Sequence, residues 1–172
     1  MKDMRILTFV DDIYEDLELW YPKIRLEEEG WQVVVAGPAA GQTYKGKHGY
    51  PCKSDAALAG QQAADFNGLL IPGGFMPDKL RRDPKVLSLV REFHAAGKPI
   101  AFICHGGWIP ISAGILRGRR ATGSLGIKDD LVNAGAVWVD EACVVDGHLI
   151  SARTPVDLAP FAAGFVAALK NM

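Results

Sequence analysis

The chain has 172 residues, 49% of them hydrophobic, so it is long enough for one domain with a continuous core and too short for two comfortable ones. Nineteen basic residues against twenty acidic ones give a net charge of −1, which leaves no overall field to attract nucleic acid or anionic lipid. We therefore expect one domain over residues 1–172, with small molecules, peptides or proteins as partners.

Nothing in the sequence indicates a membrane or a secretory route. No apolar run approaches the roughly 18 residues of a membrane-spanning helix, and the first five residues lead into a strand without a signal-peptide pattern. The three cysteines, Cys52, Cys104 and Cys143, are odd in number and widely spaced, which argues against a disulfide framework. We expect a cytoplasmic protein.

Metal and cofactor sites are not indicated either. The cysteines form no CxxC motif, and His48, His94 and His148 lie apart in the sequence, without ligand partners at metal spacing. The segment Ile71-Pro72-Gly73-Gly74 lacks the lysine and the spaced glycines of nucleotide-binding loops. We therefore expect no metal and no cofactor.

The first elements alternate between two periodicities. Residues 5–10 form a compact apolar strand, and apolar residues between 17 and 24 then recur at the spacing of one helix face. This helix should end at Gly30, and Pro22 within it should produce a kink. Residues 31–36 supply a second strand, followed by a glycine-rich loop with room for short strands.

The second half continues the alternation. A buried strand over 66–71 stops at Pro72-Gly73-Gly74, and a helix begins at Asp83-Pro84 and ends at Gly97. The later elements are a strand over 99–103, helices over 107–116 and 129–134, a strand over 137–139, a hairpin over 143–151 turning at Asp146-Gly147, and a helix over 158–169.

Uniformly apolar strands that alternate with helices are typical of a parallel sheet covered on both faces. The sequence thus predicts a three-layer α/β/α sandwich. Ligand sites in such sheets lie beyond the carboxyl ends of the strands. Cys104, Gly73-Gly74 and the turn over 11–15 all follow strands, so we expect them at one rim.

Cys104 is the strongest candidate for chemistry. The strand over 99–103 runs directly into Cys104-His105-Gly106-Gly107, where a helix begins, so Cys104 has the position of a nucleophile elbow. The positive end of that helix would favour thiolate over thiol. The alternative, a small buried hydrophobic side chain on a strand, does not account for this position.

Six motifs in order make the chain resemble the PfpI family of intracellular proteases and general stress proteins, in the superfamily of the Parkinsonism-associated deglycase, with a fold like class I glutamine amidotransferases. They are Tyr14-Glu15-Asp16-Leu17-Glu18-Leu19, Gly46-Lys47-His48-Gly49-Tyr50, Ile71-Pro72-Gly73-Gly74, Ile103-Cys104-His105-Gly106, Ser112-Ala113-Gly114, and Gly126-Ile127-Lys128-Asp129-Asp130 with Asn133-Ala134-Gly135. The resemblance covers essentially the whole chain. It implies a flavodoxin-like sandwich, and a homodimer or a hexamer built from dimers.

The resemblance also assigns roles to single residues. It implies that Cys104 is the nucleophile, that Glu15 lies beside its sulfur, and that His105 is the base. Glu15 also fits a capping box with Asp12 as the N-cap, a role that would keep its carboxylate ionised. His105 could instead contribute only its backbone N–H to an oxyanion hole, with Gly74 giving the second N–H.

The sequence departs from the proteolytic relatives at three positions. Asp78 stands where they have a glutamate that orients the histidine from an adjacent subunit, and it is one methylene shorter. A solvated loop aspartate is the alternative interpretation. Ser124 replaces a tyrosine, and Phe75 stands where a polar or charged residue is common. These differences weaken the case for peptidase activity.

Two functional hypotheses follow. The first is a cysteine hydrolase, deglycase-like or peptidase-like, in which Cys104 attacks carbonyl adducts or peptides without a cofactor. The second is a redox-responsive stress protein or holdase, in which oxidative stress reversibly oxidises Cys104.

Overall fold

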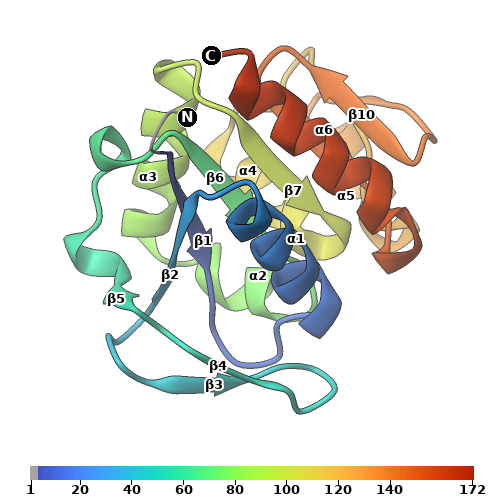
Figure 1. Ribbon diagram of the computed structural model, residues 1–172. Helices are drawn as coiled ribbons and strands as arrows, with labels where there is room; N and C mark the ends of the chain where they lie inside the picture. Colours follow the sequence, from blue (N-terminus) through green and yellow to red (C-terminus); the bar gives the residue numbers. More distant parts are fainter. Residues whose placement is uncertain (1–3) are drawn as a thin grey trace.

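The computed structural model describes residues 4–172 and has the three layers that the sequence predicts (Figure 1). A seven-stranded sheet has the order β10-β11-β7-β6-β1-β2-β5, and only β10 runs antiparallel to its neighbour. Its strands are β1 (Arg5–Phe9), β2 (Gln32–Gly37), β5 (Ala56–Ala57), β6 (Gly68–Ile71), β7 (Ile100–Ile103), β10 (Cys143–Asp146) and β11 (Leu149–Ala152). The flavodoxin-like expectation is confirmed.

Helices cover both faces of the sheet. α1 (Asp16–Glu28) and α6 (Leu158–Lys170) lie side by side on one face, and α3 (Pro84–Ala95) lies on the other (Figure 1). The remaining helices are α2 (Met76–Leu80), α4 (Trp108–Ala113), α5 (Lys128–Asn133) and five single 3₁₀ turns. Two small sheets complete the fold, one of β3 (Thr43–Lys45) with β4 (Pro51–Lys53) and one of β8 (Arg120–Ala121) with β9 (Val137–Trp138).

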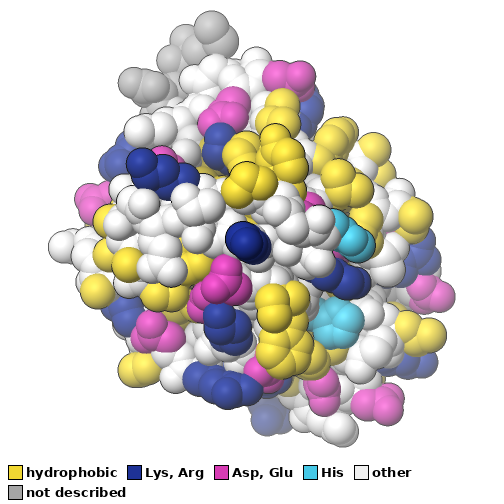
Figure 2. Space-filling model, turned by 90° about the horizontal axis from the view of Figure 1, so that it is seen from below, with side chains coloured by type: hydrophobic (Ala, Val, Ile, Leu, Met, Phe, Trp, Pro, Cys, Tyr) yellow, Lys and Arg dark blue, Asp and Glu magenta, His cyan; other side chains and the backbone are white. Residues whose placement is uncertain are grey.

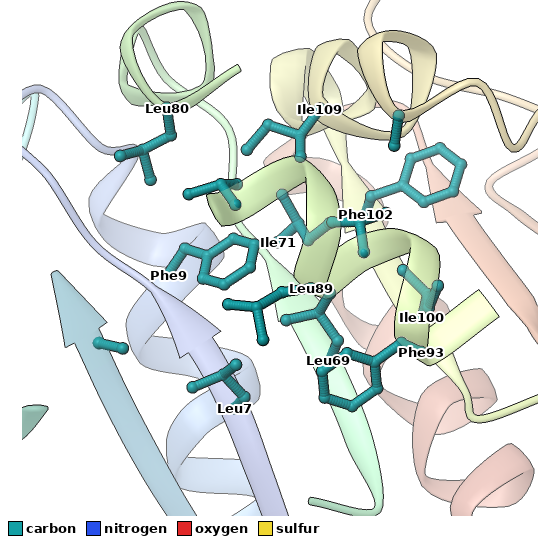
Figure 3. Close-up of a cluster of buried hydrophobic side chains, with 14 of the residues drawn as sticks. Leu7, Phe9, Leu69, Ile71, Leu80, Leu89, Phe93, Ile100, Phe102 and Ile109 are labelled. Carbon is teal, nitrogen blue, oxygen red and sulfur yellow. The ribbon is translucent and has the colours of Figure 1, made fainter. Parts of the chain in front are cut away.

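The alternation of side chains along β1 divides the core in two. Leu7 and Phe9 point toward α3, where they pack with Leu89, Phe93 and other apolar side chains (Figure 3). Ile6 points to the opposite face and belongs to the cluster under α1 and α6. Because both faces are covered, β6 and β7 are fully buried and uniformly apolar, as the sequence indicated.

Most expected boundaries agree with the structure to within two residues. The exceptions have local causes. α4 is shorter than the helix expected over 107–116, because residues 104–107 form a 3₁₀ turn and Gly114 ends the helix in the left-handed conformation, with φ 77°. α2 was not expected, because only one turn of helix follows Gly74, too little for a periodic pattern. Pro22 lies inside an α1 that continues to Glu28.

The order of the strands shows which edge of the sheet is suited to bind a ligand. From β1 the chain moves to β2 on one side, and later to β6, β7 and β11 on the other. The carboxyl ends of β1, β6 and β7 therefore surround the point where the strand order reverses, which is where α/β sheets bind ligands.

Candidate active site

Cys104 occupies the strained position that defines an elbow. Its φ is 59°, in the left-handed region that residues with a side chain seldom adopt, and β7 ends at the residue before it. This conformation lifts the side chain out of the sheet, so the thiol is half-buried and lines a cavity of about 420 Å³. The nucleophile elbow is therefore present.

His105 turns back toward the sulfur. Its Nδ1 lies 3.2 Å from the Cys104 Sγ, so the two side chains are within hydrogen-bonding distance although they are neighbours in sequence. The ring packs edge-on against Trp108, whose indole Nε1 donates to Asp130. Burial, and then the positive charge of Lys47, lower the pKa of His105, so the imidazole is neutral and able to accept a proton at pH 7.

The acidic residue beside the sulfur is Glu18, and the expectation for Glu15 is wrong on this point. Glu15 is the N-cap of α1, and its Oε2 accepts from the Glu18 N–H at 2.9 Å. The capping alternative was also wrong in detail, because Asp12 accepts from the Lys45 N–H instead. Capping turns the Glu15 carboxylate back onto the helix, and one turn later Glu18 reaches inward.

Glu18 is fully buried and is held between two backbone segments. Its Oε2 accepts from the Gly73 N–H at 2.7 Å, and its carboxyl group interacts with the Cys104 thiol. The second oxygen, Oε1, has no nitrogen or oxygen partner within residues 4–172. Burial, and then the charge of Glu15, raise the pKa of Glu18 to about 8. Glu18 is therefore a neutral acid at pH 7.

The surroundings of the thiol oppose the effect expected from the helix end. Burial, and then the nearby carboxyl of Glu18, raise the pKa of Cys104 to about 12, and hydrogen bonds from the N–H groups of His105 and Gly74 offset only part of this. The helix after Cys104 is a 3₁₀ turn followed by six residues, too short for a strong dipole. The sulfur therefore has to give up its proton as it reacts.

Two glycines shape the opposite wall. A Cβ on Gly73 would lie 2.5 Å from the Glu18 Oε2 and 3.0 Å from the Cys104 Cβ. Gly74 has φ 80°, and a Cβ there would meet the backbone of Ile13 and Glu15 at 2.5 Å. The lack of side chains brings backbone amides up to the sulfur.

The remaining expected residues lie farther out. Asp78 is in α2 and forms an ion pair with Arg82 of its own chain. Its role toward a histidine of another subunit stays a prediction. Ser124 caps the 3₁₀ turn over Leu125–Ile127, and Phe75 is half exposed at the cavity wall.

The β3–β4 loop, residues 46–50, also reaches the cavity, which sequence reasoning missed. Lys47 and His48 line it, and the His48 Nε2 lies 3.7 Å from the Glu15 Oε1. Glu15, Asp16 and His48 bring their ligand atoms within 4.8 Å of one another, although His48 was expected to lack such partners. Asp16, however, already accepts from the backbone N–H groups of His48 and Tyr50, and so anchors this loop.

The model of the DJ-1/PfpI family matches residues 4–168. The chain belongs to the DJ-1/PfpI family.

Individual family members show how similar the chain is. A deglycase of Pyrococcus horikoshii is 46% identical over 167 residues, which cover 97% of this chain and all of that protein. Deglycase PfpI of Pyrococcus furiosus is 43% identical over the same lengths. The crystal structure of Drosophila melanogaster DJ-1beta, 28% identical, superposes with a TM-score of 0.91 and covers 99% of this chain and 92% of that one.

The matches to these relatives span nearly the whole of this chain. No helix within residues 4–172 has both the length and the apolar character needed to cross a membrane.

Proposed function

We propose that this DJ-1/PfpI protein is a cysteine-dependent hydrolase that acts on carbonyl adducts or peptides, with Cys104 as its nucleophile. The observation that carries the proposal is the arrangement around the sulfur. A strained elbow holds it 3.2 Å from a neutral imidazole, and the Gly74 and His105 amides point toward it. The deglycase names of close relatives support the reaction class.

The raised thiol pKa determines how the first step runs. As the sulfur forms a bond to the substrate carbonyl carbon, the thiol proton moves to the Nδ1 of His105 and the C–O π electrons move to the oxygen. The N–H groups of Gly74 and His105 then hold the oxyanion. His105 is the general base of this step, because the resting thiol is not ionised.

The second step returns the proton. Where the attacked carbon carries the leaving nitrogen, as in a peptide or an amide-like adduct, the oxyanion re-forms the C=O bond, the carbon–nitrogen bond breaks and His105 gives the proton to that nitrogen, which leaves an acyl group on Cys104. Water then adds to the thioester carbon and gives its proton to His105, and this proton returns to the sulfur as the acid is released. Glu18 stays neutral beside the sulfur throughout, so it adds no negative charge near the oxyanion. No step needs a cofactor.

The test is turnover of methylglyoxal adducts of N-acetyl-lysine and of a fluorogenic peptide. Cys104→Ala should abolish turnover, and His105→Ala should reduce kcat by about 100-fold or more, the usual contribution of a general base. Cys143→Ala is the matched control, since Cys143 is also a half-buried free thiol but lies away from the cavity. Full activity of Cys104→Ala would overturn the proposal, and unchanged rates in His105→Ala would remove the base.

A second candidate is a redox-responsive stress protein, and one observation favours it. Neutral Glu18 beside the sulfur is a hydrogen-bond donor for an oxidised sulfur, and Cys52 and Cys143 are both free thiols, so no disulfide partner is bonded in the chain. Two molecules of hydrogen peroxide would then oxidise the Cys104 thiol through sulfenic to sulfinic acid, each transferring one oxygen atom to the sulfur and leaving as water. Intact-mass spectra without this change would exclude a sensor.

A further inference from the structure

The active-site cavity contains a positive charge that the proposed mechanism does not use. Lys47 lies in the loop between β3 and β4, far in sequence from β6 and β7, yet it lines the same cavity as Cys104 and His105. Figure 2 shows the end of the molecule on which this loop lies, where basic, acidic and histidine side chains are interspersed with apolar ones.

The backbone of the loop is held at each of its residues near Lys47. The Lys47 N–H donates to the Tyr14 carbonyl at 2.7 Å, and the His48 N–H donates to the Asp16 Oδ2 at 2.9 Å. The Gly46 N–H donates to the Tyr50 carbonyl at 2.9 Å and closes the loop. The backbone that carries the Lys47 side chain is therefore held in place beside the cavity that Lys47 lines.

Lys47 shares the cavity with two glutamates, Glu15 and Glu18, but pairs with neither. The Lys47 ammonium forms no ion pair within residues 4–172, while the Glu15 carboxylate is engaged by the Glu18 N–H and faces His48. Glu18 is neutral at pH 7. The charge of Lys47 nevertheless acts on both groups, since it adds to the effect of burial in lowering the pKa of His105 and partly opposes the effect of burial that raises the pKa of Glu18.

We propose that Lys47 recognises a carboxylate on the substrate, so that the cavity favours carbonyl compounds or peptides that carry an anionic group close to the reactive carbonyl. For turnover this inference rests on the proposed hydrolase function. The charge selection itself acts on any reagent that enters the cavity, and it can be measured without turnover.

Iodoacetate and iodoacetamide form a matched pair of probes, because they differ in charge but hardly in size. With either reagent the Cys104 sulfur forms a bond to the methylene carbon, iodide leaves with the bonding electrons, and the thiol proton passes to solvent. The rate at Cys104 is followed by peptide mapping, which separates it from Cys52 and Cys143. The ratio of the two rates cancels any change in thiol pKa, because that change affects both reagents equally.

We expect Lys47→Met to lower the iodoacetate to iodoacetamide ratio roughly 5-fold at low salt, as for one charge acting across a few ångströms of water. Lys45→Met is the matched control, because Lys45 is exposed on the adjacent strand and does not line the cavity. In wild type the ratio should fall as salt is added. An unchanged ratio in Lys47→Met, or an equal loss in Lys45→Met, would overturn the inference.

These outcomes are separable from the hydrolase test. If Lys47→Met alters the ratio while wild type hydrolyses nothing, the carboxylate site stands and the hydrolase proposal fails. If wild type hydrolyses neutral and anionic adducts equally and the ratio does not change, the hydrolase stands and the carboxylate site fails.

Discussion

At the scale of single residues, the protonation states of three groups govern the site. Glu18 and Cys104 are both buried acids with raised pKa values, and His105 is a buried base with a lowered one. Low dielectric surroundings disfavour the charged forms of these three groups, so all three are neutral at rest. Reactivity then depends on moving a proton during the reaction.

This predicts a bell-shaped dependence of kcat/KM on pH. Activity should be lost in acid below pH 6.5, as His105 becomes protonated, and lost again around pH 8, as Glu18 ionises and places a negative charge beside the sulfur. Glu18→Gln keeps the size of the side chain and cannot ionise. Its profile should retain the acid limb and lack the alkaline limb near pH 8. An identical alkaline limb in both proteins would assign it to another group.

Gly73 gives a second prediction at this scale. A methyl group there would overlap the Glu18 Oε2 and press on the Cys104 Cβ, so Gly73→Ala should displace the carboxyl group and reduce kcat by about 10-fold or more. Gly60→Ala is the control, because a Cβ at Gly60 has open space and its φ is not positive. Steady-state kinetics of both variants check this, and equal rates would contradict the steric account.

At the scale of elements, the N-terminus of α1 explains why Glu18, and not Glu15 as the sequence suggested, lies beside the sulfur. Its cap decides which glutamate faces the cavity, because Glu15 at the N-cap folds back to the Glu18 N–H and leaves Glu18 to point inward. A side chain that bonds its own helix end is a local event, and sequence spacing does not separate Glu15 as cap from Asp12 as cap.

The cap gives a prediction for α1. Glu15→Ala should lower the free energy of unfolding by about 1 kcal/mol, since it leaves a helix-end N–H without its acceptor. Glu15→Gln retains a carbonyl oxygen for this bond and should lose less. Urea unfolding of the three proteins at pH 7 measures the difference. Equal stability of Glu15→Ala and wild type would show that the cap contributes nothing.

The other elements show what a sequence pattern can and cannot predict. The alternation of buried strands and helices predicted the sheet, its helical layers and the elbow at Cys104, because these follow from hydrophobic periodicity and from glycine and proline positions. Glu18 and Lys47 were missed, because Glu18 reaches the sulfur only through the direction of its side chain, and Lys47 through a loop folded over from β3 and β4. Neither depends on periodicity.

At the scale of the whole molecule, two histidines 54 residues apart join α3 to the β10–β11 hairpin. His148 Nε2 and His94 Nδ1 lie 2.9 Å apart, so the pair that looked dispersed in sequence is in contact. Burial lowers the pKa of both, Arg119 adds to this, and Asp146 opposes it at His148. Both rings are therefore neutral in the folded protein at pH 7.

This contact should make stability depend on pH. Below about pH 6.5, the ordinary pKa of histidine, the unfolded chain binds protons that the folded pair resists, so stability should fall as pH falls toward 5. His94→Gln should reduce this slope, while His48→Gln, an exposed control, should retain it. Urea midpoints at pH 5 and pH 7 measure both. A slope unaltered in His94→Gln would contradict the assignment.

Several large apolar side chains are exposed on one part of the surface. Leu17, Tyr21 and Ile24 on α1 and Tyr50 on the β3–β4 loop are all more than 40% exposed, which is unusual for side chains of this kind so close together. The homodimer implied by the family resemblance stays a prediction, as does a hexamer built from it.

The left-handed backbone conformation of Cys104 lowers the stability of the folded protein. At φ 59°, a residue with a side chain lowers the free energy of unfolding by about 1 kcal/mol or more, whereas glycine adopts this conformation without that loss. Cys104→Gly should therefore unfold at a higher urea concentration than Cys104→Ala, although both lack the sulfur. Glycine would therefore be the more stable residue at position 104, and the proposed role of the sulfur would account for a cysteine in this strained conformation.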